Sequence, residues 1–210
     1  MPKIVDHHKQ KQKVAQAAMR VIKQEGLESA SVRKIAVEAG ISAGSMRHYF
    51  STQQELFLFS MNLIQERVKE RIAKLPLNGS TEENVFTLLE QVLPLDEERI
   101  FEMEVWQAFT VKALTEPDLQ PLNAKMYDEL FQTVQFCLMK LKEDELLLDH
   151  LDLLLETERL YAVINGLALN GIVQPHRLPP QLMRSVLQMH LQSITKKDMP
   201  SSPEVGKYKN

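Results

Sequence analysis

The residues with the most specific chemistry in this sequence lie in the segment 42–48, which reads SAGSMRH. Its arginine, Arg47, can donate two parallel hydrogen bonds to O6 and N7 of a guanine in the major groove of DNA. Gly44 is unfavourable inside a helix, but it allows another backbone to come close. This combination favours readout of a DNA sequence by Arg47, and the alternatives are a phosphate clamp or a solvated surface charge.

Polar residues around this segment have types that suit contact with a phosphate backbone. Arg33 and Lys34 begin a predicted helix, where their charges oppose the helix dipole and add little stability, so phosphate contact would explain their presence. The nearby serines are helix caps first and phosphate donors second. The residues predicted to contact DNA are Ser31, Arg33, Lys34, Ser42, Ala43, Gly44, Ser45, Arg47, His48 and Tyr49.

Two short helices must position these side chains, and the segment 32–50 has the pattern for them. A helix-turn-helix needs a small residue where the helices cross, a glycine in the turn and apolar residues facing inward. Ala36 and Gly40 fill the first two roles, and the predicted helices are 32–39 and 43–49. An ordinary helical hairpin that binds no DNA is the alternative. The predicted inward residues are Ile35, Ala39, Ile41, Met46 and Tyr49 or Phe50.

The rest of the chain is predicted to be all-α, because it is rich in helix-forming residues and poor in alternating β-branched ones. A three-helix head is expected at 1–51, a larger helical domain at 52–195, and a flexible tail at 196–210. The broad apolar stripe of the helix at 52–74 indicates a connector that is buried on two sides. The other predicted helices are 8–25, 81–93, 97–115, 118–142, 145–173 and 180–194.

Charge is distributed unevenly along the chain. The first 56 residues contain nine Lys and Arg against five Asp and Glu, whereas residues 57–210 contain sixteen against twenty-three. A basic head on an acidic body is typical of a DNA-binding segment joined to a domain with another task. With one cysteine, no secretory signal and no membrane-spanning stretch, the chain is predicted to be cytoplasmic, without an internal disulfide, metal or cofactor.

The head resembles the TetR family of bacterial regulators, through the motifs VRKIA (32–36), AGIS (39–42), GSM (44–46) and HYF (48–50), followed by Glu55 and Leu56. More weakly, the segments VWQAF (105–109) and NGLAL (165–169) resemble the BetI-type C-terminal class. Two positions depart from the family pattern. Arg47 stands where many members have Tyr, and Gln53 stands where a Lys commonly opens the fourth helix and grips a phosphate.

This resemblance implies an all-α homodimer that pairs through its last two long helices. Residues 52–195 would then form a regulatory ligand-binding and dimerisation domain that holds a small molecule. The apolar residues of those helices could form the dimer contact, serve the internal core, or do both: Leu160, Val163, Ile164, Leu167, Val186, Leu187 and Leu191. The implied ligand-contacting residues, whose mixture would suit a flat or greasy ligand, are Met61, Trp106, Phe109, Tyr127, Phe131, Tyr161 and Asn165.

The sequence therefore predicts a sequence-specific transcriptional regulator, a repressor that a small-molecule effector releases from double-stranded, palindromic operator DNA. The alternative is a helical protein-interaction or small-molecule-binding module that binds no DNA. An enzyme is not expected, because Glu156, Glu158 and His150 form no Glu-x-x-His pair and no other converging set of acids and histidines is visible.

Overall fold

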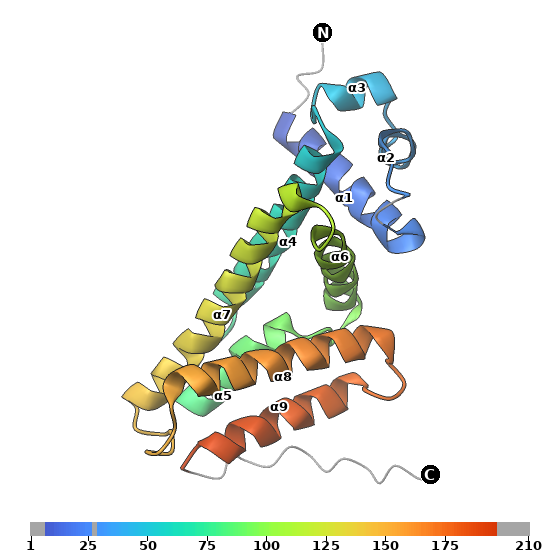
Figure 1. The fold of residues 1–210 in the computed structure, drawn as a ribbon. Coiled ribbons are helices and arrows are strands. Elements are labelled where there is room, and N and C mark those ends of the chain that lie inside the picture. The colour runs from blue at the N-terminus through green and yellow to red at the C-terminus, as the bar shows by residue number, and fades with distance from the viewer. Residues whose placement is uncertain (1–6, 27–28, 197–210) are drawn as a thin grey trace. The chain divides into compact units, whose positions relative to one another are not determined.

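The computed structural model describes residues 7–26 and 29–196, which fold into helices joined by short turns (Figure 1). The chain divides into two compact units. Unit 1 consists of residues 1–70 and 104–124, and unit 2 consists of residues 71–103 and 125–210. Three helices run from one unit into the other, namely α4 (Gln53–Ala73), α6 (Glu97–Ala113) and α7 (Gln120–Glu143). The predicted tail, apart from Lys196, lies outside the described residues.

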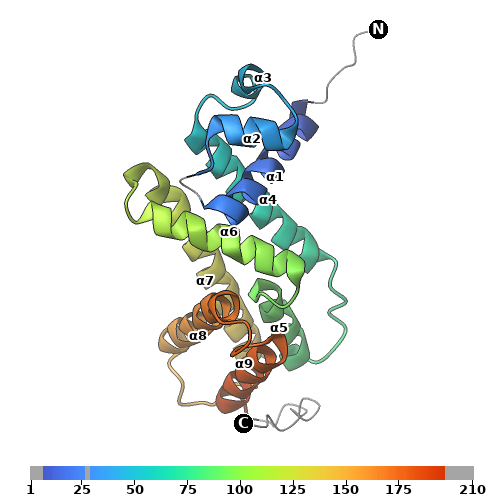
Figure 2. The ribbon, with the colours of Figure 1, turned by 90° about the vertical axis from the view of Figure 1, so that its right-hand side faces the viewer.

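The first three helices of unit 1 form a small head with its own core. They are α1 (His7–Glu25), α2 (Val32–Ala39) and α3 (Ala43–Arg47), and α2 lies across α1 (Figure 2). The inward positions predicted from the sequence are confirmed for most residues, whereas Ile41 and Tyr49 are only half-buried. The buried ones are Ile35, Ala36, Ala39, Met46 and Phe50.

Local hydrogen bonds set the limits of the two short helices. Ser31 Oγ accepts a bond from the Lys34 amide at 3.4 Å, which caps α2 at its start. Gly40 ends α2 with φ of 67°, a left-handed conformation that glycine adopts without strain. The predicted end of α3 at residue 49 is wrong by two residues. The amides of His48 and Tyr49 bond three residues back in a tighter turn, which brings Phe50 into the core.

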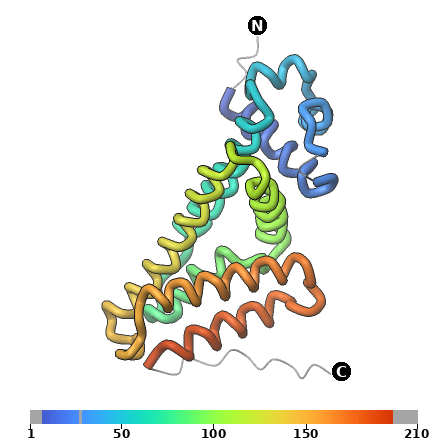
Figure 3. Tube along the Cα trace, in the orientation of Figure 1, coloured from blue at the N-terminus to red at the C-terminus, as the bar shows by residue number. Residues whose placement is uncertain are grey.

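Unit 2 contains α5 (Thr81–Leu89), α8 (Leu153–Val173) and α9 (Pro180–Ile194), with α8 and α9 antiparallel and side by side (Figure 3). The predicted limits of α9 are confirmed. The predicted helix 81–93 ends earlier and continues as the 3-10 helix η1 (Glu90–Val92), while in unit 1 the 3-10 helix η2 (Pro117–Leu119) precedes α7. No helix of the described residues is long and apolar enough to cross a membrane.

The predicted helix 145–173 is wrong in its first part, because α8 begins only at Leu153. Glu145 has φ of 57° and turns the chain away from α7. The next residues pair with the end of α9: the Leu148 amide donates to the Ile194 carbonyl, and Leu147 forms a single antiparallel bridge with Thr195. Asp152 then starts α8 by accepting a hydrogen bond from the Leu155 amide at 3.0 Å.

The apolar residues of α8 and α9 that were candidates for a dimer contact lie mainly in the core of unit 2. Five of them have at most 6% of their surface exposed. These five serve the internal core, which was one of the alternatives that the sequence left open, whereas Val163 and Val186 are half-buried. The five core residues are Leu160, Ile164, Leu167, Leu187 and Leu191.

A part-buried ion pair joins α4 and α6 within unit 2. Arg71 Nη2 donates to Glu102 Oε2 at 2.8 Å and to the Gln91 carbonyl oxygen at 3.4 Å. The side chain of Glu102 is only 6% exposed and that of Arg71 is 21% exposed. Each charge therefore depends on the other, since burial of an unpaired charge is strongly unfavourable.

Candidate DNA interface and ligand-contact residues

The positive charges of the head fall into two groups. Lys34 forms an ion pair with Glu25, and Arg20 Nε donates to Glu38 Oε1 at 2.6 Å. By contrast, Arg47 at the end of α3 is exposed, and within the described part of the chain its guanidinium has neither a hydrogen bond nor an ion pair. The same holds for Arg33 on α2. These two side chains are open to a partner, as a DNA-contacting residue must be.

The remaining predicted DNA contacts lie around Arg47 and have different environments. Ser42 Oγ accepts a hydrogen bond from the Ser45 amide at 3.0 Å and lies 2.9 Å from Ser45 Oγ, so both hydroxyls help to start α3. Tyr49 is half-buried, with its ring centroid 4.9 Å from that of His7. The hydrogen bonds of Ser42 and Ser45 therefore show a capping role at the start of α3, whereas contact of these residues with DNA remains a prediction. The exposed members of the set are Ser31, Ser42, Ala43, Gly44, Ser45 and His48.

Within unit 2, the structure brings together three of the predicted ligand-contacting residues. The ring centroid of Tyr161 lies 6.2 Å from that of Tyr127 and 5.9 Å from that of Phe131. All three rings are half-buried, and Asn165, one turn along α8, donates to the Tyr161 backbone carbonyl at 3.2 Å. Burial raises the pKa of the Tyr161 phenol to about 12, so its hydroxyl stays neutral near pH 7.

The other three predicted ligand-contacting residues belong to unit 1. Met61 and Phe109 have 1% and 2% of their surface exposed, and Trp106 is half-buried. Large side chains this deeply buried contribute mainly to packing, so the structure favours a core role for Met61 and Phe109. Trp106 and the aromatic cluster of α7 and α8 remain the stronger candidates for ligand contact.

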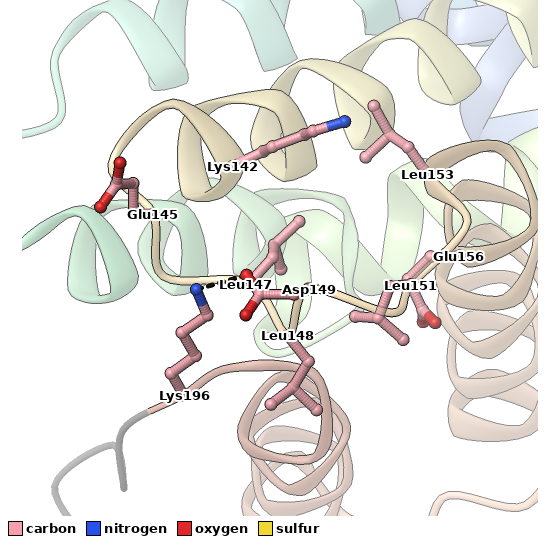
Figure 4. Close-up of a pocket in the computed structure, with 9 residues that line it drawn as sticks. All are labelled: Lys142, Glu145, Leu147, Leu148, Asp149, Leu151, Leu153, Glu156 and Lys196. Carbon is pink, nitrogen blue, oxygen red and sulfur yellow. Dashed lines mark ion pairs between the residues drawn. The ribbon is translucent and has the colours of Figure 1, made fainter.

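A cavity that the sequence did not predict lies beside the loop between α7 and α8 (Figure 4). Its volume is about 370 Å³, and it contains none of the predicted ligand-contacting residues. Its charges are largely paired, because Lys196 Nζ lies 2.6 Å from Asp149 Oδ1 and Glu156 accepts a hydrogen bond from Arg159. The lining residues are Lys142, Glu145, Leu147, Leu148, Asp149, Leu151, Leu153, Glu156 and Lys196.

Beside this cavity, His190 makes folding sensitive to pH. Its side chain is 10% exposed, with Nε2 3.3 Å from Glu156 Oε1, and burial together with the Arg159 charge holds its pKa below the ordinary histidine value. The unfolded chain therefore takes up a proton first, and the free energy of unfolding falls as the pH drops below about 6.5. Urea unfolding of H190Q should lose part of this pH dependence.

The control for this measurement is His176→Gln, because His176 is exposed. Its unfolding should keep the pH dependence of the unaltered protein. Equal pH profiles for H190Q and the unaltered protein would contradict the assignment to His190. The described residues contain no cluster of three or more His, Cys, Asp or Glu side chains arranged to hold a metal ion.

Comparisons with known proteins agree with this geometry. Residues 15–58 match the family model for bacterial regulatory proteins of the tetR family, and this segment contains α2 and α3. Residues 81–196 match the family model for the C-terminal region of BetI-type transcriptional repressors. The two matches cover the head and most of the remaining helices.

Full-length relatives and solved structures lead to the same family. The chain is 41% identical over 199 residues to the transcriptional regulator PksA of Bacillus subtilis, covering 94% of this chain and 96% of PksA. It is 26% identical over 181 residues to BetI 1 of Chromohalobacter salexigens, covering 83% and 85% of the two chains. A transcriptional regulator structure from Rhodococcus sp. Rha1 superposes with a TM-score of 0.76 at 30% identity, covering 88% of this chain and 95% of that one. The chain therefore belongs to the TetR family of DNA-binding transcriptional regulators, with a BetI-type C-terminal region.

Proposed function

We propose that this regulator is a repressor that binds a palindromic operator as a homodimer and leaves it when a small-molecule effector binds. The observation that carries the proposal is a pair of exposed arginines on the two helices of the helix-turn-helix, Arg33 on α2 and Arg47 on α3. Neither has a hydrogen-bond or ion-pair partner among residues 7–26 and 29–196. In this proposal residues 1–51 read the DNA, and residues 52–195 hold the effector and the second copy. The relatives are transcriptional regulators, and no enzymatic activity is proposed.

The experiment that tests this function measures DNA retention and its release. DNA from around the chain's own gene should be retarded at low salt, with a binding constant that falls steeply as salt rises. The two heads of a dimer fit successive major grooves only at one spacing. An effector that binds more tightly when the heads have another spacing must lower operator affinity. The free energy of this effect equals the one by which the operator lowers effector affinity. Failure of any such DNA to bind would favour the alternative, an interaction module without DNA binding.

An exposed apolar stripe on α8 supports the homodimer. Leu155, Ala162, Gly166, Leu169 and Val173 lie along one face of that helix, and this face is interrupted only at the turn of Glu158 and Arg159. The leucines and the valine are between 43% and 69% exposed, and a Cβ added to Gly166 would meet no atom within 4 Å. A helix face with apolar ends and small residues at its middle allows the same face of a second copy to pack closely.

Substitution of Leu169 by glutamate should separate the dimer. Each copy would then place an unpaired carboxylate in an apolar contact, which raises the dimer dissociation constant about 100-fold. The control is Leu154→Glu, because Leu154 is also an exposed leucine of α8 but lies off the stripe. Sedimentation of both variants measures the effect. Equal dimer dissociation constants for L169E and the unaltered protein would place the contact elsewhere.

For the effector, we propose a molecule with a flat apolar or cationic face that packs against Tyr127, Phe131 and Tyr161. Aromatic ring faces attract cations as well as apolar groups. A structural neighbour from Saccharomonospora viridis was solved in complex with choline; it has a TM-score of 0.79 and 20% identity, and covers 90% of this chain and all of that one. Choline is therefore a reasonable first compound to add in the DNA release measurement.

A further inference from the structure

A side-chain hydrogen bond joins the start of α4 to the segment before α2. Gln53, the first residue of α4, donates from Nε2 to the backbone carbonyl oxygen of Ala30 at 2.7 Å. Ala30 is fully buried, and Ser31, the capping residue of α2, follows it directly. The bond is short and supplies a donor to a carbonyl in a buried residue, where a missing donor is unfavourable.

The position of this bond in the chain is as informative as its length. All of α2, the turn at Gly40 and all of α3 lie between Ala30 and Gln53. The bond therefore closes residues 30–53 into a loop that contains the complete helix-turn-helix. A closed segment has fewer alternative conformations than an open one, so its two helices are held in fixed relation to α4.

Other contacts also hold the first turn of α4 in place. Glu55 accepts a hydrogen bond from the Ser51 amide at 2.8 Å, and its own amide donates to Thr52 Oγ1 at 3.0 Å. Lys11 of α1 lies 3.7 Å from the Glu55 carboxylate and above the rings of Phe50 and Phe59. These contacts fix α4 to α1 and to the end of the helix-turn-helix, and Gln53 alone of this group reaches its beginning.

We propose that Gln53 is a positioning residue that closes the helix-turn-helix onto α4, and that it does not contact DNA. At this position the family resemblance predicts a lysine that grips a DNA phosphate. Here the side chain is uncharged and half-buried, and its amide already donates to the Ala30 carbonyl. Movement of α4 is then passed to the start of α2 through this bond as well as through the covalent chain to α3.

Two variants of Gln53 and one matched control test the proposal. Gln53→Ala removes the donor, and Gln53→Glu keeps the shape but presents oxygen to the carbonyl. The control is Gln54→Ala: Gln54 is the next residue of the same turn, and its Nε2 also donates to a backbone carbonyl, that of Asp118 at 3.1 Å. That bond lies outside the closed segment. Amide hydrogen exchange without DNA and binding to the operator fragment are measured for all three.

The expected result is a local loosening that is visible before any DNA is added. Amides of α2 and α3 should exchange about fivefold faster in Q53A and Q53E than in the unaltered protein or Q54A, and operator affinity should fall about three- to tenfold. The exchange measurement needs neither DNA nor an effector, so it tests the role of Gln53 independently of the proposed function. Weaker operator binding with unchanged exchange would make Gln53 a DNA contact and overturn the proposal. Equal acceleration in every helix, or no change at all, would overturn it too.

Discussion

Replacement of Arg47 by alanine is expected to weaken binding to the operator about 10- to 100-fold while leaving the fold intact. A guanidinium bonded to O6 and N7 of guanine contributes about 1–3 kcal/mol of discrimination between bases. Because Arg47 is exposed and has no hydrogen-bond or ion-pair partner in the described residues, its removal breaks no internal contact. Gel retardation with the operator and with unrelated DNA measures the loss of specificity, and thermal unfolding checks the fold.

Arg33→Ala is the matched control for this loss. A contact to phosphate carries no sequence information, so this variant should weaken operator and unrelated DNA alike. It should also reduce the slope of log K against log salt by about one, whereas Arg47→Ala should change mainly the ratio of the two affinities. If Arg47→Ala weakens both DNAs equally and also lowers the slope, Arg47 is a phosphate clamp and sequence readout lies elsewhere on α3.

The second large effect is expected from Glu102→Ala, which should lower the free energy of unfolding by about 3–5 kcal/mol. The substitution leaves Arg71, with its 21% exposed side chain, without the carboxylate that lies 2.8 Å from its Nη2. The remaining contact of that nitrogen, to the Gln91 carbonyl at 3.4 Å, is longer and neutral. Urea unfolding measures the change through the midpoint at constant slope.

Glu143→Ala gives the comparison, because Glu143 pairs with Lys140 at 2.6 Å and the two side chains are 54% and 48% exposed. An exposed pair contributes little to stability, so this variant should remain close to the unaltered protein. Replacing both Arg71 and Glu102 by leucine should recover much of the stability that Glu102→Ala loses. A loss below about 1 kcal/mol in Glu102→Ala would show that water compensates the charge and that the pair behaves as a surface pair.

The head was predictable because its determinants are local. Ser31 and Gly40 delimit α2 by hydrogen bonds within a few residues, and the predicted range 32–39 is confirmed. Once the inward-facing residues of the third helix were assigned, Arg47 was predicted to be exposed, and the structure confirms that it is exposed. The prediction of the TetR family is also confirmed. It too could be made from local sequence, because the family motifs contain these capping and inward-facing residues in the same order.

Features that depend on distant residues were not predictable. The helix expected from residue 145 is displaced by pairing of Leu147 and Leu148 with residues about fifty positions later, at the end of α9. Burial of Glu102 depends on a partner from another helix, which helical periodicity does not reveal. The bond from Gln53 to Ala30 likewise forms only in the folded head, so the sequence indicated only that the expected lysine is absent.

Cys137 has a thiol that is shielded from reagents in the folded protein. It is the only cysteine of the 210 residues, it is fully buried on α7, and burial raises the pKa of its thiol to about 12. At pH 7 the thiol is therefore protonated, and the reactive thiolate is scarce. A cysteine introduced at an exposed position such as Ser51 would therefore react alone with a spin label or fluorophore. In the proposed homodimer, the distance between the two labelled heads then becomes measurable without first removing the native thiol.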